Sequence, residues 1–471
     1  MKRNYIILLI CLLSSVVKAG VHTYAPSSVL SNGTFVKISV KESGIHSISY
    51  ETLKSWGLKP ENVAVLGYGG AVLSEDFTRH HWDDVPSVPF YMQKGSDGVF
   101  NAGDHLLFYA QGPTSWQMAT TGYWNHKQNP YSDYGYYFVT DKVELQRLIQ
   151  LDKATYNTAS QKEVDWFYSL YVHERDSFNL IDLNGQFGGG REFYGEFLNS
   201  QYLSRTITFD VPNIRTTNTA ACVVDLAASS GSSTPVQVSY AGSTSTATMA
   251  PILVSDYHTR ATLGKAEIYA VPVAGNQQSV TLQLRSAQSG AVAYLNYVEM
   301  NIPRALVMVG DEMPITNTSY LGQTASLKFR MTGANDNIQV WRITNGVDVT
   351  MMPIVYKDGT VTWVGSNSEA ERYVAVNVNA KNWKQPTKVG IVPAQNLHAL
   401  ENIDYVIICP EQFKEPALRL AKKHEEIDHL TWAVVTDQEV YNEFSSGTPD
   451  ASAYRWLMKM LYDRAQGVRD F

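Results

Sequence analysis

Near the C-terminus, residues 405–409 read YVIIC and residues 431–436 read TWAVVT. Both runs are short, apolar and rich in β-branched residues, which predicts two buried strands. Between and after them, apolar residues recur every three to four positions, the period of an amphipathic helix. The order strand, helix, strand, helix, helix predicts a parallel sheet with helices on its faces, the beginning of an α/β domain.

The helices of this stretch have recognisable starts. Pro410 and Glu411 begin the first one, and a single face is predicted to carry Phe413, Ala417, Ala421, His424 and Ile427. Thr436 and Glu439 have the spacing of a capping box. Thr448 followed by Pro449 predicts an N-cap with proline at the first helical position. The last helix is predicted to bury the stripe Ala453, Trp456, Leu457, Met460 and Leu461. Because parallel sheets are covered on both faces, two strands are too few, and we expect either a domain that something else completes or a fragment.

Upstream of this stretch the chain is predicted to be β-rich. Val36, Ile38 and Val40 alternate with polar residues, which predicts a half-buried strand. The same alternation recurs at 207–211, 236–240, 280–284 and 298–302 between Ser-, Gly- and Thr-rich turns, as in a β-sandwich of the jelly-roll kind. We therefore expect a multidomain, mostly β chain: an N-terminal β-rich domain at 20–187, a β-sandwich at 188–304, and a β-rich region at 305–400. That last region is either a small module or a return into the first sheet.

Composition limits the function. The chain has 471 residues and a formal net charge of −7, with no Lys/Arg-rich face, which argues against a nucleic-acid binder. Lys2 and Arg3, the apolar run 5–13 and the small residues before Gly20 predict a signal peptide at 1–19. No other apolar run approaches the length of a membrane span. Removal of Cys11 would leave Cys222 and Cys409, too few for a disulfide scaffold or a thiolate zinc site.

Three loops carry residues that could bind a ligand. The run 67–70, Gly-Tyr-Gly-Gly, follows a strand as a nucleotide loop does, but no helix opens after it, so a turn is favoured. The run 80–84, His-His-Trp-Asp-Asp, could offer metal ligands, yet an exposed loop is the better interpretation. The run from Asp97 to Asp104 lacks the spacing of a calcium loop and is predicted to be a hairpin turn.

One thiol lies where α/β sheets place ligands. Cys409 ends the first parallel strand, and His398 and Asn396 are near it in sequence, so a Cys/His nucleophile pair is conceivable. A small buried apolar residue is the favoured interpretation of Cys409. His424 is interpreted as a packing residue and not as a base. From residue chemistry alone we predict no catalytic, cofactor-binding or metal-binding residue in this chain, and no cofactor.

Several runs resemble the gingipain-type cysteine peptidases. They are 395–398 (QNLH), 404–408 (DYVII), 417–421, 434–436 and, most specifically, 441–450 (YNEFSSGTPD). Upstream, the runs 43–46, 67–70, 104–109, 129–134, 296–301 and 340–344 resemble the N-terminal region of the branch of this family that serves as sortases of the type IX secretion system.

The resemblance implies a caspase-like α/β domain in which a histidine deprotonates a thiol that attacks a scissile carbonyl. It implies protein cargo with C-terminal targeting domains as substrate, an amine on anionic lipopolysaccharide as acceptor, and other type IX secretion components as partners. It further implies export by the signal peptide, from the periplasm to the cell surface and outer membrane. The family's catalytic histidine and cysteine lie beyond the matching positions here, so residues 401–471 would be the first part of the peptidase domain and the chain by itself an inactive N-terminal fragment. The alternative is a non-catalytic surface protein that binds cargo or secretion components and carries a remnant peptidase fold.

Overall fold

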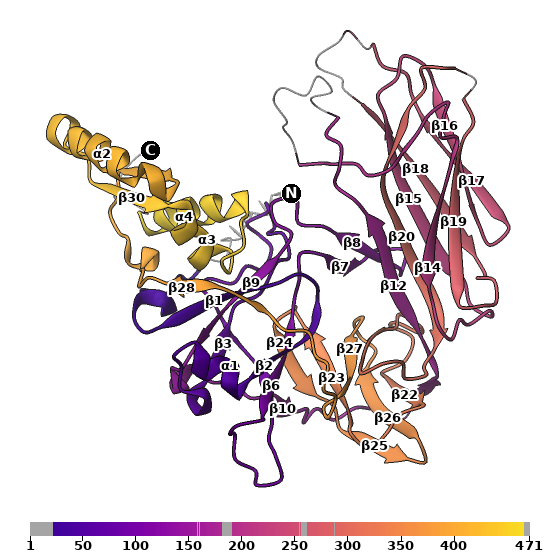
Figure 1. Cartoon of the computed structure of the whole chain (residues 1–471), viewed down its shortest axis with the longest axis horizontal. Coiled ribbons are helices and arrows are strands. Elements are labelled where there is room, and N and C mark those ends of the chain that lie inside the picture. The colour runs from indigo at the N-terminus through magenta and orange to yellow at the C-terminus, as the bar shows by residue number, and fades with distance from the viewer. Residues whose placement is uncertain are drawn as a thin grey trace, which may run out of the picture.

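The computed structural model describes residues 22–465 apart from 158, 160, 181–190, 254, 256–260 and 287. The predicted signal peptide and the first residues of the predicted sandwich domain lie outside the described residues. Figure 1 shows a β-sandwich at one side of the molecule, the first β-domain and the 305–400 region beneath, and the C-terminal helices at the opposite side. The predicted fold class, mostly β with an α/β segment at the C-terminal end, is confirmed.

The first β-domain packs two sheets against each other. One has the order β28-β1-β9-β3-β4 and the other the order β2-β6-β5. Their bounds are β1 (Phe35–Val40), β2 (Gly44–Ser49), β3 (Ala64–Leu66), β4 (Ser87–Val88), β5 (Phe90–Gln93), β6 (His105–Ala110), β9 (Gly135–Thr140) and β28 (Thr387–Val392). The apolar side chains of β1 and β9 meet those of β6 in a shared core, as alternation predicts. The run Asp97 to Asp104 joins the antiparallel strands β5 and β6, so the predicted turn is confirmed.

The sequence left open whether the region 305–400 is a separate module or returns into the first sheet, and the structure shows that it does both. Strand β28 returns to the first sheet and pairs antiparallel with β1. The other strands join two further sheets. One is a four-stranded sheet of order β11-β22-β26-β25, made by β11 (Lys162–Val164), β22 (Ser326–Thr332), β25 (Ile354–Lys357) and β26 (Thr360–Ser366). The second is part of a ten-stranded sheet that continues into the sandwich.

That ten-stranded sheet runs in the order β10-β24-β23-β27-β21-β12-β20-β15-β18, with β13 paired to β20. Its strands are β10 (Gln150–Leu151), β12 (Trp166–Glu174), β13 (Phe197–Leu198), β15 (Ala220–Ala228), β18 (Thr262–Ala270), β20 (Ala293–Ala305), β21 (Glu312–Thr316), β23 (Ile338–Thr344), β24 (Asp348–Met351) and β27 (Arg372–Asn377). Its sandwich half packs on the sheet β14-β19-β16-β17, formed by β14 (Ser204–Asp210), β16 (Thr234–Tyr240), β17 (Ser243–Met249) and β19 (Gln277–Leu284).

A hairpin arm ties the first β-domain to the sandwich. It is made of β7 (Ser115–Met118) and β8 (Trp124–Lys127) and lies beside β12 and β20 (Figure 1). Asn301 bonds the backbone of Trp124 in both directions, at 2.7 and 2.8 Å. His126 Nδ1 lies 2.6 Å from Glu299 and its Nε2 lies 2.7 Å from Glu174. Burial would lower the pKa of His126, but these two carboxylates raise it to about 9, so the arm is held by a buried ion pair.

The α/β segment has the predicted order. Strands β29 (Tyr405–Cys409) and β30 (Trp432–Thr436) pair in parallel, and the helices are α2 (Lys414–Asp428), α3 (Asp437–Phe444) and α4 (Ala451–Arg464). The remaining helical turns are α1 (Tyr50–Ser55) and the 3-10 turns at Val29–Ser31, Pro60–Asn62, Val143–Leu145, Leu397–Ala399 and Glu411–Phe413. No helix in the described part of the chain is long and apolar enough to span a bilayer.

Two details of the helices differ from expectation. On α2 only Ala417 and Ala421 are buried, while Phe413, just before the helix, is 53% exposed and Ile427, near its end, is 70% exposed. The N-cap of α4 is Asp450, whose side chain accepts from Ser452 N, and not Thr448. The capping box at Thr436 and Glu439 and the buried stripe of α4 are both confirmed.

Candidate functional site

The most distinctive polar site is the seam where the α/β segment sits on the first β-domain. Lys37 on β1 was expected on the open face of a half-buried strand, but it is buried. Its Nζ donates to Asn442 Oδ1 of α3 at 3.0 Å and lies over the ring of Tyr136. Desolvation lowers the pKa of Lys37 to about 8. The second face of this strand is therefore covered by the α/β segment, which alternation within the strand could not indicate.

The turn between α3 and α4 docks on the glycine turn 67–70. Ser446 Oγ accepts from Tyr68 N at 2.9 Å and donates to Tyr136 O at 3.0 Å. Thr448 Oγ1 donates to Gly69 O at 2.9 Å, which explains why this hydroxyl does not cap α4. Gly69 has φ +78°, and a Cβ there would lie 2.1 Å from Gln111 O, so a glycine is required. The predicted turn is confirmed, and it is buried because the turn between α3 and α4 packs on it.

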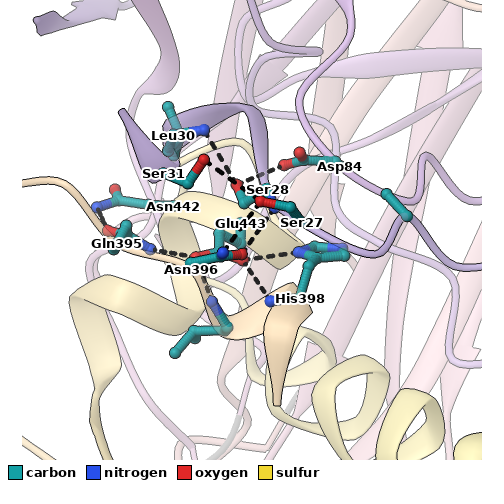
Figure 2. Close-up of polar contacts among 12 residues, drawn as sticks. Ser27, Ser28, Leu30, Ser31, Asp84, Gln395, Asn396, His398, Asn442 and Glu443 are labelled. Carbon is teal, nitrogen blue, oxygen red and sulfur yellow. Dashed lines mark hydrogen bonds and ion pairs between the residues drawn. The ribbon is translucent and has the colours of Figure 1, made fainter. Parts of the chain in front are cut away.

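At the centre of the seam lies Glu443, whose side chain is fully buried (Figure 2). Its carboxylate accepts from Gln395 Nε2 at 3.0 Å, from the backbone N–H groups of Leu397 and His398 at 2.8 and 3.1 Å, and from His398 Nδ1 at 2.6 Å. Gln395 Oε1 in turn accepts from Asn442 Nδ2 at 2.9 Å. A continuous chain of hydrogen bonds thus runs from β1 through α3 to the turn that precedes β29.

His398 is held on both sides. Its Nε2 lies 2.9 Å from Asp83 O and 3.6 Å from Asp83 Oδ1, and its ring stacks on Phe444 at 4.8 Å. Burial would lower the pKa of His398, but its bonds to Asp83 and Glu443 and the charge of Asp84 raise it to about 10. The imidazole is therefore protonated at neutral pH, and both ring nitrogens donate.

The loop 80–84 is half-buried in this seam, apart from His80, and is not the exposed loop that was expected. His81 stacks on Trp456 of α4 with ring centroids 4.0 Å apart, and burial lowers its pKa to about 3. Asp84 accepts from Val29 N at 2.6 Å and from Ser28 Oγ at 3.2 Å. The loop contacts both the N-terminal segment and α4, and its own sequence does not reveal either contact. No group of three or more His, Cys, Asp or Glu side chains in the described residues is arranged to hold a metal ion.

The N-terminal segment is hydrogen-bonded into the same seam. Asn396 Oδ1 accepts from Ser28 N at 2.8 Å, and Asn396 Nδ2 donates to Ser27 Oγ at 3.0 Å (Figure 2). Arg464, at the end of α4, donates to His398 O at 2.6 Å and to Ala25 O at 2.7 Å. Three parts of the chain, near residues 28, 84 and 398, therefore meet around one buried histidine.

The candidate thiol is not part of this cluster. Cys409 is 8% exposed, and desolvation raises the pKa of its thiol, which disfavours the nucleophilic thiolate. His398 cannot serve it as a base, because both imidazole nitrogens are engaged elsewhere and the ring keeps its proton. Cys222 lies in the sandwich core, where burial raises its thiol pKa to about 12. Neither thiol is in a disulfide.

His424 and Asn396, the other residues weighed for chemistry, have structural contacts. His424 Nδ1 bonds Asp428 at 2.7 Å on the half-exposed side of α2, and its ring packs on Tyr405. The residue that sequence reasoning missed is Glu443. Its only sequence signal was an acidic residue beside Phe444 inside the family-like run 441–450. The geometry suits the site for rigid positioning of β29, β30 and α4, and not for proton transfer.

Comparison with known proteins gives two positive results. The model of Peptidase family C25 matches residues 398–469, a range that begins at the buried histidine and contains β29, β30 and α2–α4. A crystal structure of dimeric latent PorU from Porphyromonas gingivalis aligns with a TM-score of 0.81 and 27% identity over 95% of this chain and 41% of that chain. The chain thus spans about two fifths of the length of that PorU structure.

Two other comparisons contribute nothing. No curated protein sequence matches the chain. A structure of infectious bursal disease virus aligns with 8% identity and a TM-score of 0.10 over 86% of this chain and 93% of that chain, too low to carry an argument. The chain therefore has a PorU-like fold, and its C-terminal residues 398–469 match the model of Peptidase family C25.

Proposed function

We propose that this chain is the N-terminal part of a secreted, gingipain-like cysteine endopeptidase that acts as a sortase of type IX secretion. In this proposal the enzyme cleaves C-terminal targeting domains from exported cargo and attaches the cargo to the cell surface. The observation that carries the proposal is the agreement with PorU over 95% of the chain at a TM-score of 0.81, together with the C25 match at 398–469.

The residues of this chain would serve the enzyme by positioning. The seam fixes the first two parallel strands of the peptidase domain against the first β-domain, through contacts that exclude water. Active sites in α/β sheets lie at the carboxyl ends of parallel strands, so the orientation of β29 and β30 sets where that edge faces. In this assignment Cys409 is a buried packing residue, and the nucleophile and its histidine come from outside residues 22–465.

The test compares two products. One is the polypeptide encoded by the whole reading frame that contains this chain, and the other is the chain ending at Phe471. Each is incubated with a reporter protein that carries a C-terminal targeting domain, and cleavage is followed by intact mass. We expect cleavage by the longer product, its loss after iodoacetamide treatment, unchanged cleavage by a Cys409→Ser variant of the longer product, and no cleavage by the shorter chain.

The alternative, a non-catalytic surface protein that binds cargo or secretion components, has one observation in its favour: neither thiol among the described residues is activated. It would be supported if the reading frame adds no further strand-end cysteine and histidine, and if the chain retains the targeting domain on a column without cleaving it. Cleavage that depends on Cys409 would contradict both assignments.

A further inference from the structure

A small cavity lies where three parts of the molecule meet. Its walls come from the first β-domain with its hairpin arm, from β12, and from the outward faces of β21 and β27. The cavity has a volume of about 170 Å³. Its lining includes three aromatic and three polar side chains: Tyr109, Trp116, Tyr168, Glu312, Thr316 and Arg372.

The guanidinium of Arg372 uses only part of its hydrogen-bonding capacity. Its Nη2 donates to Tyr109 Oη at 3.2 Å, and this is its only side-chain hydrogen bond within the described residues, where no carboxylate forms an ion pair with it. Arg342, on the adjacent strand β23, shows the contrast, since it lies 3.4 Å from Asp152 and 3.2 Å from Glu371. A guanidinium has five N–H donors in a planar fork that matches a carboxylate, so Arg372 has capacity left for an anion.

The rest of the lining limits the kind of anion. Glu312 also lines the cavity, but its carboxylate is occupied by Ile45 N at 2.9 Å and by Lys384 at 3.5 Å. Thr316 pairs with Arg372 across the two strands, and Glu312 is four residues further along the same strand, about 13 Å away at the rise of an extended strand. Lys384 also lies 3.7 Å from Glu42, so Lys384, Glu312 and Glu42 together carry one net negative charge, and Arg372 supplies the one positive charge that has no carboxylate partner among the described residues. This favours a single negative charge and disfavours dianions.

Aromatic walls and volume limit the body of the ligand. The rings of Tyr109, Trp116 and Tyr168 line the cavity beside the polar side chains of Ser43, Glu312, Thr316 and Arg372, and small-molecule sites likewise combine aromatic walls with polar groups that orient the ligand. A volume of about 170 Å³ is close to the roughly 150 Å³ of an apolar cavity that holds benzene. The space therefore fits one ring or branched aliphatic group with a carboxylate.

We propose that this cavity is a binding site for a small monocarboxylate with an aromatic or aliphatic body, whose carboxylate pairs with Arg372. The same chemistry is offered by a free acid and by the C-terminal residue of a polypeptide. The site is independent of the proposed peptidase function, because it lies at the junction of β-domains and away from β29 and β30.

The test uses the whole chain from residue 22 and calorimetry or ligand-observed NMR. The probes are 3-phenylpropionate, its uncharged amide, and phenylsuccinate as a dianion. We expect 3-phenylpropionate to bind with a Kd on the order of 1 mM, usual for a ligand of this size, and the other two at least about tenfold more weakly. Short peptides ending in phenylalanine, prepared as free acid and as amide, separate the two sources. Binding of the acid peptide would identify a polypeptide C-terminus as the ligand. If 3-phenylpropionate binds and the acid peptide does not, the ligand is a free acid.

Variants locate the site. Arg372→Met should weaken binding of 3-phenylpropionate at least about tenfold, whereas Arg330→Met, on the exposed side of β22, should leave it unchanged. If Arg372→Met does not fold, the comparison of 3-phenylpropionate with its amide on the unaltered chain still tests whether the site recognises a carboxylate. Equal affinity for acid and amide, no binding of 3-phenylpropionate at 10-fold above the expected Kd, or an unchanged affinity in a folded Arg372→Met variant would each overturn the proposal.

Discussion

At the scale of single residues, the seam depends most on Glu443, a fully buried carboxylate that faces a protonated histidine. Glu443→Gln keeps the shape of the side chain but removes the negative charge that balances the buried imidazolium of His398. Breaking one side of a buried ion pair costs about 3–5 kcal/mol. We expect a loss of that order in the unfolding free energy, measured by chemical denaturation. Glu426→Gln, on the exposed side of α2, should change it by less than about 0.5 kcal/mol. An equal effect of the two variants would contradict the assignment.

The raised pKa of His398 predicts a pH dependence. Its folded value of about 10 lies above the ordinary 6.5, so the folded chain binds a proton that the unfolded chain releases. The stabilisation is complete below about pH 6.5 and is lost as the pH rises toward 10. His126, raised to about 9, acts in the same direction, and together the two histidines outweigh Lys37, whose pKa is lowered to about 8 and which alone would raise stability above that pH. We expect the unfolding free energy to fall between pH 7 and 10, and His398→Gln to flatten that slope, while His424→Gln leaves it intact. A slope that rises with pH would contradict the ion pairs.

The two thiols should be inert in the folded chain. Burial raises the pKa of Cys222 to about 12 and raises that of Cys409, so little thiolate forms at pH 8. With the chain from residue 22, we expect labelling by a disulfide reagent to be at least about tenfold slower before than after denaturation. Rapid labelling of Cys409 in the folded chain would reopen its assignment as a nucleophile.

At the scale of elements, the glycine turn 67–70 offers a matched pair of substitutions. Gly69 and Gly98 both have positive φ, +78° and +69°, but only Gly69 would place a Cβ against backbone, 2.1 Å from Gln111 O. Gly98→Ala should cost only the backbone strain of about 1–2 kcal/mol. Gly69→Ala should cost clearly more, because the turn that receives Ser446 and Thr448 has to move. Thermal unfolding of both variants tests this, and equal shifts of the melting temperature would show that the docking is not tight.

Elements defined by local pattern could be predicted from the sequence, and those defined by distant contacts could not. The strands β29 and β30, the capping box at Thr436 and the buried stripe of α4 follow from periodicity and cap chemistry within a few residues. The cap of α4 was assigned wrongly because Thr448 has a partner in the first β-domain, which leaves Asp450 as the cap. The burial of Lys37 and of the loop 80–84 was missed for the same reason.

Most of the candidate site could not be predicted from the sequence. Glu443, His398 and Asp83 are separated by up to 360 residues and share no spacing that marks them as a cluster. Sequence reasoning correctly predicted that Cys409 is a buried apolar residue and that residues 67–70 form a turn. The family resemblance pointed to the right run, 441–450, without showing that its acidic residue is the centre of the seam.

At the scale of the whole molecule, the C-terminal segment is continuous with the first β-domain. Tyr24, Leu73 and Phe77 from that domain are partly buried and pack against the core that the strands and helices of the C-terminal segment form. Two parallel strands alone leave apolar faces uncovered, as the exposed Phe413 just before α2 and the exposed Ile427 on α2 show. We therefore expect the C-terminal α/β segment to depend on the first β-domain for its stability.

The most direct measurement of this dependence compares residues 400–465 alone with the chain from residue 22. Thermal unfolding is followed by circular dichroism for the piece and by hydrogen exchange at β30 and α4 for the chain. We expect no cooperative transition in the isolated piece, and in the longer chain we expect β30 and α4 to lose protection together with β1 and β9. A cooperative transition of the isolated piece, or exchange at β30 and α4 well before the first β-domain unfolds, would contradict the account.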